Sequence, residues 1–156
     1  MRRSEREIKG RTELFEVLSQ CQVIRLALFD EKYPYIVPLS FGIEQENENI
    51  SVYFHCANEG RKTALLKKNN RVCVEADAFG GYFGEGMNAT TLYKSVIGFG
   101  KCEKCEGGEK LRGLELLLSH CGREPDRAML SKCAALEKTA VYKITFDELT
   151  GKKNIK

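Results

Sequence analysis

Several features that would assign a function at once are missing from this sequence of 156 residues. It has no internal repeat or low-complexity linker, and its longest apolar runs are far shorter than the roughly 20 residues of a membrane-spanning helix. The first residues are charged and no apolar stretch follows them, so we expect no secretory signal peptide. Lys and Arg number 25 against 22 Asp and Glu, and a net charge of +3 is too small to indicate a nucleic-acid-binding protein. The sequence therefore predicts neither a membrane nor a nucleic-acid partner.

What remains is the composition of a soluble globular protein. Hydrophobic residues make up 42% of the chain and charged residues 30%, which excludes disorder as the main state. The length corresponds to one domain with a single core. We therefore predict one domain over residues 1–156, with a basic arm at residues 1–10 and a basic tail at residues 147–156.

The seven cysteines are an odd number in a chain without a predicted leader, so we expect a cytoplasmic protein with reduced thiols. Cys102 and Cys105 form a CxxC pair, but the second pair of a zinc ribbon is missing. His120, Cys121 and Cys133 would complete a four-ligand set only if a strand end and two helices converged. A redox CxxC usually opens a helix, whereas this one lies near a strand end beside glutamates. We therefore predict structural thiols and no metal site, and the role of the pair stays open.

Hydrophobic alternation predicts six strands, at residues 23–30, 35–43, 50–56, 72–77, 95–104 and 139–146. Helices are expected after Thr12, after residues 58–59 and after residues 107–108, and the glycine-rich residues 80–92 are expected to form a long loop. Most connections are too short for the crossovers of a parallel sheet. The prediction is a mainly β protein, a six-stranded antiparallel barrel with flanking helices.

The most informative stretch joins the third strand to a helix. The strand ends near His55, and the helix opens with Gly60, Arg61 and Lys62. Two cations oppose the dipole at a helix N-terminus, and a phosphate bound there would resolve this conflict. The alternative is that both side chains simply extend into water, and the pattern alone does not choose between the two.

Two further stretches are weak signals when taken singly. Tyr93-Lys94-Ser95-Val96 places a hydroxyl beside a cation at the start of a strand, which could complete a phosphate pocket. Tyr35-Ile36-Val37-Pro38-Leu39-Ser40-Phe41 carries a proline inside a strand, which indicates an edge or a bulge. Backbone groups left unpaired there could face a flat heteroaromatic ring.

Taken together and in order, these motifs resemble the FMN-binding split-barrel family related to pyridoxamine 5′-phosphate oxidase. The resemblance rests on residues 34–41, on His55-Cys56-Ala57 with Gly60-Arg61-Lys62, and on Ser95-Val96. Its nitroimidazole-resistance branch is more similar, since Met1-Arg2-Arg3 and Leu149-Thr150-Gly151-Lys152 also match that branch.

The resemblance implies a homodimer that binds FMN in grooves between its subunits. It assigns the phosphate to Arg61 and Lys62, with Ser95 contributing from the adjacent strand, and the cofactor-binding residues also include His55, Gly60, Lys94 and Val96. The isoalloxazine ring would lie against Val37, Pro38, Leu39 and Ser40. His55 would lie beside the flavin as the catalytic residue, where it could orient or protonate a reduced nitro group.

The function implied is that of an FMN-dependent oxidoreductase. It would pass electrons from NAD(P)H or another donor to a small organic acceptor, such as a nitroimidazole or another nitroaromatic. The ending at residues 151–156 has no counterpart of the substrate-phosphate residues of the true pyridoxamine-phosphate oxidases, so vitamin B6 oxidation is not implied. The alternative is a non-catalytic module that binds FMN or haem, for which His55 and His120 are the histidine candidates for an axial ligand. The sequence does not define the physiological substrate.

Overall fold

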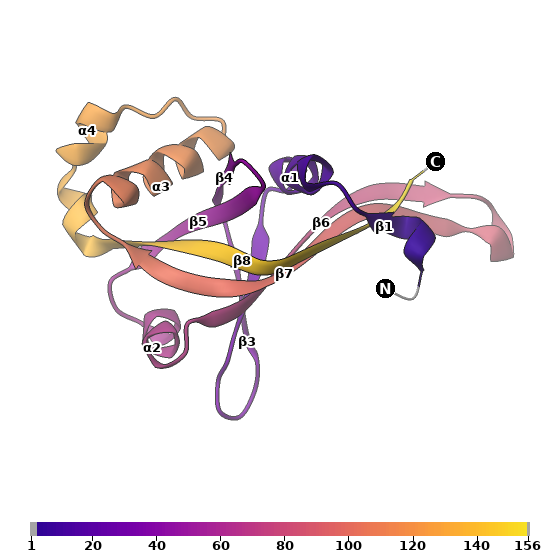
Figure 1. Ribbon diagram of the computed structural model, residues 1–156, viewed down its shortest axis with the longest axis horizontal. Coiled ribbons are helices and arrows are strands. Elements are labelled where there is room, and N and C mark those ends of the chain that lie inside the picture. Colours follow the sequence, from indigo (N-terminus) through magenta and orange to yellow (C-terminus); the bar gives the residue numbers. More distant parts are fainter. Residues whose placement is uncertain (1–2, 156) are drawn as a thin grey trace.

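The computed structural model describes residues 3–155, which form one curved antiparallel sheet with helices packed around it (Figure 1). The sheet order is β3-β2-β6-β7-β8-β5-β4, and β1 pairs with β8. The strands are β1 (Glu7–Ile8), β2 (Ile24–Leu28), β3 (Tyr35–Leu39), β4 (Gly42–Glu46), β5 (Asn49–Ala57), β6 (Arg71–Phe83), β7 (Thr90–Cys105) and β8 (Thr139–Asn154). The helices are α1 (Arg11–Gln20), α2 (Arg61–Lys68), α3 (Gly107–His120) and α4 (Arg127–Ser131), with short 3-10 helices at Ser4–Arg6, Gly86–Asn88 and Ala134–Lys138.

The predicted mainly β class with flanking helices is confirmed, whereas the strand count differs, because eight strands form instead of six. The predicted strand over residues 35–43 is two strands, β3 and β4, which separate at Ser40 and Phe41. Phe41 is fully buried and its ring lies 4.4 Å from that of His120. β3 and β4 lie at opposite ends of the sheet order, so the chain passes from one edge of the sheet to the other at this point. Pro38 lies on β3, an edge strand, as its missing N–H group predicted.

The glycine-rich residues 80–92 form a hairpin arm rather than the predicted loop. β6 and β7 stay paired out to Phe83 and Thr90, across a β-bulge between Phe79 and Gly81, and a 3-10 turn closes the tip. Figure 1 shows this arm, residues 79–92, reaching away from the rest of the sheet. Cross-strand pairing therefore overrides the weak strand preference of glycine.

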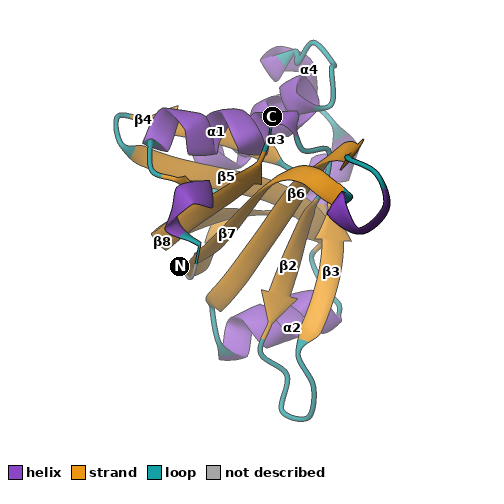
Figure 2. Cartoon of the chain, turned by 90° about the vertical axis from the view of Figure 1, so that its right-hand side faces the viewer, coloured by secondary structure: helices purple, strands orange, loops and turns teal. Residues whose placement is uncertain are grey.

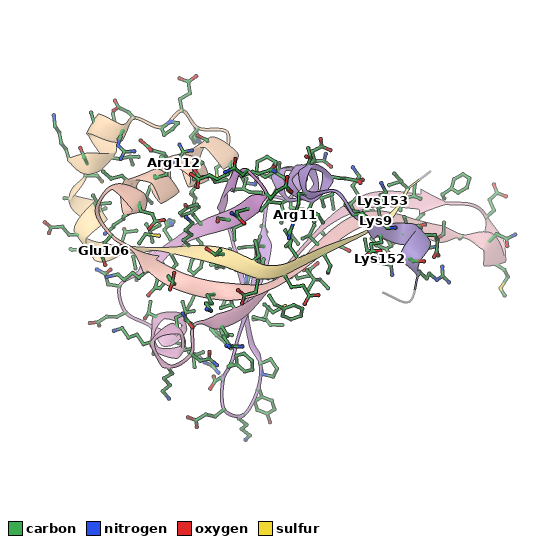
Figure 3. The ribbon with its side chains drawn as sticks, viewed as in Figure 1. Lys9, Arg11, Glu106, Arg112, Lys152 and Lys153 are labelled. Atoms are coloured by element: carbon green, nitrogen blue, oxygen red, sulfur yellow. The ribbon has the colours of Figure 1, made fainter. Side chains whose placement is uncertain are left out.

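Both predicted basic extensions take part in the sheet. Residues 147–154 continue β8 alongside β7, and Glu7–Ile8 pair with β8 at Lys152 and Gly151. Lys152 and Lys153 extend from opposite faces of β8 near the base of the arm, toward Tyr93 and Glu13 respectively (Figure 3). Met1, Arg2 and Lys156 lie outside the described residues.

The core fills the inside of the curved sheet. Alternate residues of β2 and β6 point inward and are buried: Ile24, Leu26, Leu28, Val72, Val74 and Ala76. Each large apolar side chain of this kind contributes roughly 1.5–3 kcal/mol when fully buried. α1 adds Leu14, Val17 and Leu18 on one side, and α2 lies across the opposite end (Figure 2). α1 begins at Arg11, with Gly10 rather than the predicted Thr12 in the capping position.

The opposite side of β3, β2, β6 and β7 faces away from the core, and we call it the outer face. It presents the exposed apolar side chains of Phe29, Ile36, Ile97 and Phe99, with Cys73 half-buried among them. Phe99 is 50% exposed and Ile36 57% exposed, although both lie on regular strands. In the part of the chain that the structure describes, no helix is long and apolar enough to cross a membrane.

Candidate functional site

The first turn of α2 is an open, positively charged helix end. β5 ends at Ala57, and two exposed residues, Asn58 and Glu59, lead to Gly60, which caps the helix with φ 141°. This φ favours glycine, and a Cβ at Gly60 would meet nothing within 4 Å. The cap makes no side-chain hydrogen bond and the first turn contains no acidic residue. The free N–H groups of this turn can therefore receive an anion.

Arg61 is held in place by residues of the β2–β3 connection. Its Nε donates to Oδ2 of Asp30 at 3.1 Å, and its Nη2 donates to the same oxygen at 2.5 Å. The guanidinium carbon lies 4.3 Å from the centre of the Tyr35 ring, a cation–π contact. Hydrogen bonding to Arg61 lowers the pKa of Asp30, so this carboxyl stays ionised well into acid. Arg61 still remains 60% exposed and reachable by a ligand.

Lys62 lies on the side of α2 that faces the end of the barrel. Its Nζ is 5.3 Å from the centre of the buried Phe54 ring. Partial desolvation lowers the pKa of His55, and the charge of Lys62 lowers it further, so the imidazole is neutral at pH 7. Burial raises the pKa of Cys56 more than the charge of Lys62 lowers it, so this thiol stays protonated. The charge of Lys62 therefore acts on both His55 and Cys56 at the end of β5.

β3 supplies the second wall of this region. Pro38 and Ser40 are exposed on it, whereas Val37 and Leu39 are half-buried. Since β3 pairs only with β2 in the described structure, its other edge offers backbone groups to a ligand. Pro38 lies opposite Arg25 on β2. Val37, Pro38 and Leu39 therefore lie on this open edge and Ser40 follows it, whereas Arg61 contacts the first residue of the strand, Tyr35.

Ser95, Lys94 and Val96 lie far from α2 of the same chain. Lys62 acts electrostatically on Cys102 of β7, and Ser95 precedes that cysteine by seven strand residues. At about 3.3 Å per residue, Ser95 and Cys102 are separated by about 23 Å along the strand. A serine side chain cannot bridge it, so one chain does not bring these residues to the α2 anion position.

Neighbouring residues of this strand also point in different directions. Ser95 lies opposite Asp77 and Lys152 on the outer side, and Val96 is buried in the core. Lys94 lines a cavity of about 240 Å³ on the other side, with Gln20 and Ala78. Ser95 and Lys94 therefore cannot bind one phosphate together from the same strand.

The CxxC pair is divided between two layers. Cys102 points into the core of the barrel, whereas Cys105 packs with Tyr53 and Val141 beneath α3. Burial raises the pKa of both thiols, that of Cys105 to about 12. Among residues 3–155, no group of three or more His, Cys, Asp or Glu side chains is placed to hold a metal ion. Burial keeps both thiols protonated, and the two side chains lie on opposite faces of the strand.

His120 is occupied by packing at the end of α3. Its Nε2 lies 2.8 Å from the carbonyl oxygen of Cys21, so this ring nitrogen carries the hydrogen and donates it. The ring also contacts Phe41. His120 therefore joins α3 to the end of α1, and His55 is the exposed histidine of the described chain.

Sequence reasoning missed two features of this region. One is the Arg61–Asp30 pair, because Asp30 reads simply as a turn residue. The other is a cavity of about 380 Å³ on the outer face, lined among others by Phe29, Tyr33, Cys73 and Phe99. The exposed aromatic residues give no local signal for it, since its walls come from the β2–β3 connection and from four strands, β2, β6, β7 and β8.

The curved antiparallel sheet, together with the open N-terminus of α2, defines a split-barrel protein of the flavin-binding type. The family model described as pyridoxamine 5′-phosphate oxidase matches residues 10–153. The chain belongs to this family, as the sequence motifs indicated. No curated protein matches the chain.

Solved structures share the fold at low sequence identity. A candidate 5-nitroimidazole antibiotic resistance protein from Bacteroides thetaiotaomicron is 24% identical, with a TM-score of 0.79 over 94% of this chain and 86% of that one. A FAD-binding protein from Mesorhizobium loti is 23% identical, with a TM-score of 0.68 over 96% and 98%. A FAD- and haem-binding protein from Mycobacterium smegmatis is 16% identical, with a TM-score of 0.75 over 97% and 74%.

Proposed function

We propose that this protein is a flavin-dependent oxidoreductase that binds the FMN group at the start of α2. The observation that carries the proposal is the open first turn of that helix, which joins an uncapped N-terminus to Arg61 and Lys62. It lies next to the unpaired edge of β3, where a flat ring can bind to backbone groups. When bound, the flavin would supply hydride and electron transfer, and the chain supplies the binding and the orientation.

The residues present fit the phosphate and the ring. Gly60 leaves open space where any other residue would place a side chain, and Arg61 and Lys62 provide charge-assisted donors. Val37, Pro38, Leu39 and Ser40 are assigned to the isoalloxazine ring on the edge of β3. Neighbours that bind FAD carry the same FMN group within that cofactor, which agrees with a site built for the part the two flavins share.

His55 is assigned to the reacting end of the site. Because its pKa is lowered, its imidazole is neutral at pH 7 and donates a hydrogen bond from one ring nitrogen while it accepts at the other. A neutral histidine orients the acceptor and passes a proton rather than adding a fixed charge. The acceptor class that we assign is a small nitroaromatic, with NAD(P)H as the donor; the Bacteroides neighbour supports this class.

We further propose that the functional unit is a homodimer with the flavin between its subunits. Ser95 is too far from α2 of its own chain, so the Ser95 that completes a site comes from the second subunit. It would arrive with Lys152, its direct cross-strand neighbour, which adds a second cation. The site of each subunit is then incomplete without its partner.

The outer face supports this assembly. Phe29, Ile36, Ile97 and Phe99 are apolar and exposed there on regular structure, which is typical of an interaction surface. The arm extends the same side of the sheet with Phe79 and Tyr82, whose rings meet edge to face at 5.3 Å. A second copy would bury this apolar area in both subunits at once.

The free thiols agree with the cytoplasmic location that we expect.

The absorption spectrum of the purified protein tests the proposal. We expect flavin bands as purified or after addition of FMN, with one flavin per subunit and bleaching by NAD(P)H. Lys62→Ala should weaken FMN binding by about 10- to 150-fold, since a hydrogen bond to a charged group is worth roughly 1.5–3 kcal/mol. The matched control is Lys67→Ala, which removes the same charge from the exposed last turn of α2. A protein that binds no flavin, or equal affinities in both variants, would refute the assignment.

A non-catalytic flavin- or haem-binding role is the second candidate. The Mycobacterium neighbour that binds FAD and haem favours it. Since His120 donates to the Cys21 carbonyl, His55 is the histidine available as an axial ligand. A Soret band that disappears in His55→Ala would support this candidate, whereas flavin turnover by NAD(P)H without haem would exclude it as the main role.

A further inference from the structure

Arg61 makes its strongest interaction with a residue outside the phosphate motif. Asp30 receives two N–H groups of the guanidinium through Oδ2, while its Oδ1 accepts the backbone N–H of Glu31 at 2.9 Å. Both carboxylate oxygens are therefore engaged, and the aspartate is fixed to its own loop. On the other side of the contact, the guanidinium lies over the ring of Tyr35.

This arrangement leaves part of the guanidinium unused. Arginine has five N–H donors in a rigid fork, and Asp30 takes one on Nε and one on Nη2. The two donors on Nη1 and one on Nη2 have no partner in these contacts. Since the side chain is 60% exposed, a phosphate at the start of α2 can approach that free side.

We propose that Asp30 is a positioning residue, which holds the Arg61 guanidinium over Tyr35 so that its Nη1 side meets the flavin phosphate. The proposal deepens the proposed function and rests on it. Asp30 makes no contact with the flavin in this arrangement and acts only through Arg61.

The physical reason is the cost of ordering a long side chain. A free arginine in the first turn of a helix samples many rotamers, and fixing it on binding reduces the affinity. Asp30 and Tyr35 fix Arg61 before any ligand arrives. The negative charge of Asp30 opposes the phosphate, but two hydrogen bonds from Arg61 already offset it. We expect pre-ordering to outweigh the repulsion, and the sign of the Asp30→Ala effect tests this balance.

The experiment compares FMN with riboflavin, which lacks the phosphate. Asp30→Ala should weaken FMN binding about three- to tenfold and leave riboflavin binding unchanged, as measured by flavin fluorescence titration. Glu31→Ala is the matched control, because Glu31 pairs at 3.5 Å with Lys68, away from Arg61, and both side chains are exposed. Asp30→Glu should recover part of the loss. Tighter FMN binding by Asp30→Ala would overturn the proposal, since Asp30 would then be a competitor of the phosphate.

A double-mutant cycle separates positioning from a general role in folding. In an Arg61→Ala background, Asp30→Ala should weaken FMN binding no further, because the residue that it positions is gone; removing the Asp30 charge, which Arg61 no longer offsets, should instead tighten binding. An equal loss in both backgrounds would overturn the proposal. If Asp30→Ala fails to fold, Asp30→Asn, which keeps an acceptor of similar size, carries the same comparison.

The outcomes also separate this inference from the proposed function. If neither Arg61→Ala nor Lys62→Ala changes FMN binding, the phosphate site itself is wrong. If both weaken FMN binding and Asp30→Ala does not, the phosphate site stands and the positioning role of Asp30 is refuted.

Discussion

A chain with Lys62→Ala and a chain with Ser95→Ala should repair each other's flavin site when they share a dimer. Within one chain, Ser95 lies about 23 Å along β7 from Cys102, the residue whose pKa the charge of Lys62 lowers, so in the proposed homodimer each site combines Lys62 and Ser95 from different subunits. In the mixed dimer one site carries both substitutions and the other carries neither. The intact site should bind FMN with the affinity of the unmodified protein.

The magnitude follows from counting sites. Equal amounts of the two chains give mixed dimers in about half of the population, each with one intact site. About a quarter of all sites should therefore bind FMN tightly, while each parent protein binds about 10- to 150-fold more weakly. Equilibrium dialysis at an FMN concentration between the two dissociation constants measures this fraction directly.

A second mixture controls for subunit exchange without repair. Lys62→Ala and Arg61→Ala both lie on α2, so their mixed dimer contains no intact site, whichever subunit supplies Ser95. Distinct affinity tags on the two chains verify that mixed dimers have formed. If mixed dimers are present and no tight FMN sites appear in the Lys62→Ala and Ser95→Ala mixture, the shared site is refuted.

Three further outcomes are expected. His55→Ala should retain FMN affinity and slow turnover of a nitroaromatic by about 10²-fold in steady-state assays, and a loss of flavin binding instead would contradict its placement. The folded protein lowers the pKa of His55, so folding favours the neutral imidazole and the free energy of unfolding decreases as pH falls below about 6.5. In urea titrations below this pH, His55→Gln should show a smaller decrease than the unmodified protein. Gly100→Ala should destabilise the protein by about 1–3 kcal/mol, because its Cβ would lie 2.1 Å from the Thr145 carbonyl oxygen, whereas Gly10→Ala, with nothing within 4 Å, should change the urea midpoint little.

The β strands of the barrel were predictable because their apolar residues alternate. Val72, Val74 and Ala76 point into the core as that pattern requires, and β2 follows the same rule. The arm was not predictable, because glycine lowers the local strand preference at residues 80–92. The arm forms because β6 and β7 pair with each other over its whole length. The long continuation of β8 has the same cause, because β7 pairs with it as far as Asn154.

The candidate site divides in a similar way. The order of strand, glycine and two cations predicted the open start of α2, because capping and dipole effects are local. The partners of those cations were not predictable. Asp30 reaches Arg61 from 31 positions earlier in the sequence, and only the packing of the β2–β3 connection against α2 brings them together.

By itself, the sequence determined the mainly β class and the family, since hydrophobic alternation and motif order are short-range patterns, and it predicted which residues can hold a phosphate. The tertiary structure decided which of those residues meet. It placed His55 within the electrostatic influence of Lys62 and put Lys94 and Ser95 on opposite faces of β7. It also separated Ser95 from α2 by several residues of extended strand. The physical reason is that a strand is extended and alternates at every residue, so a motif that is compact in sequence is spread out in space.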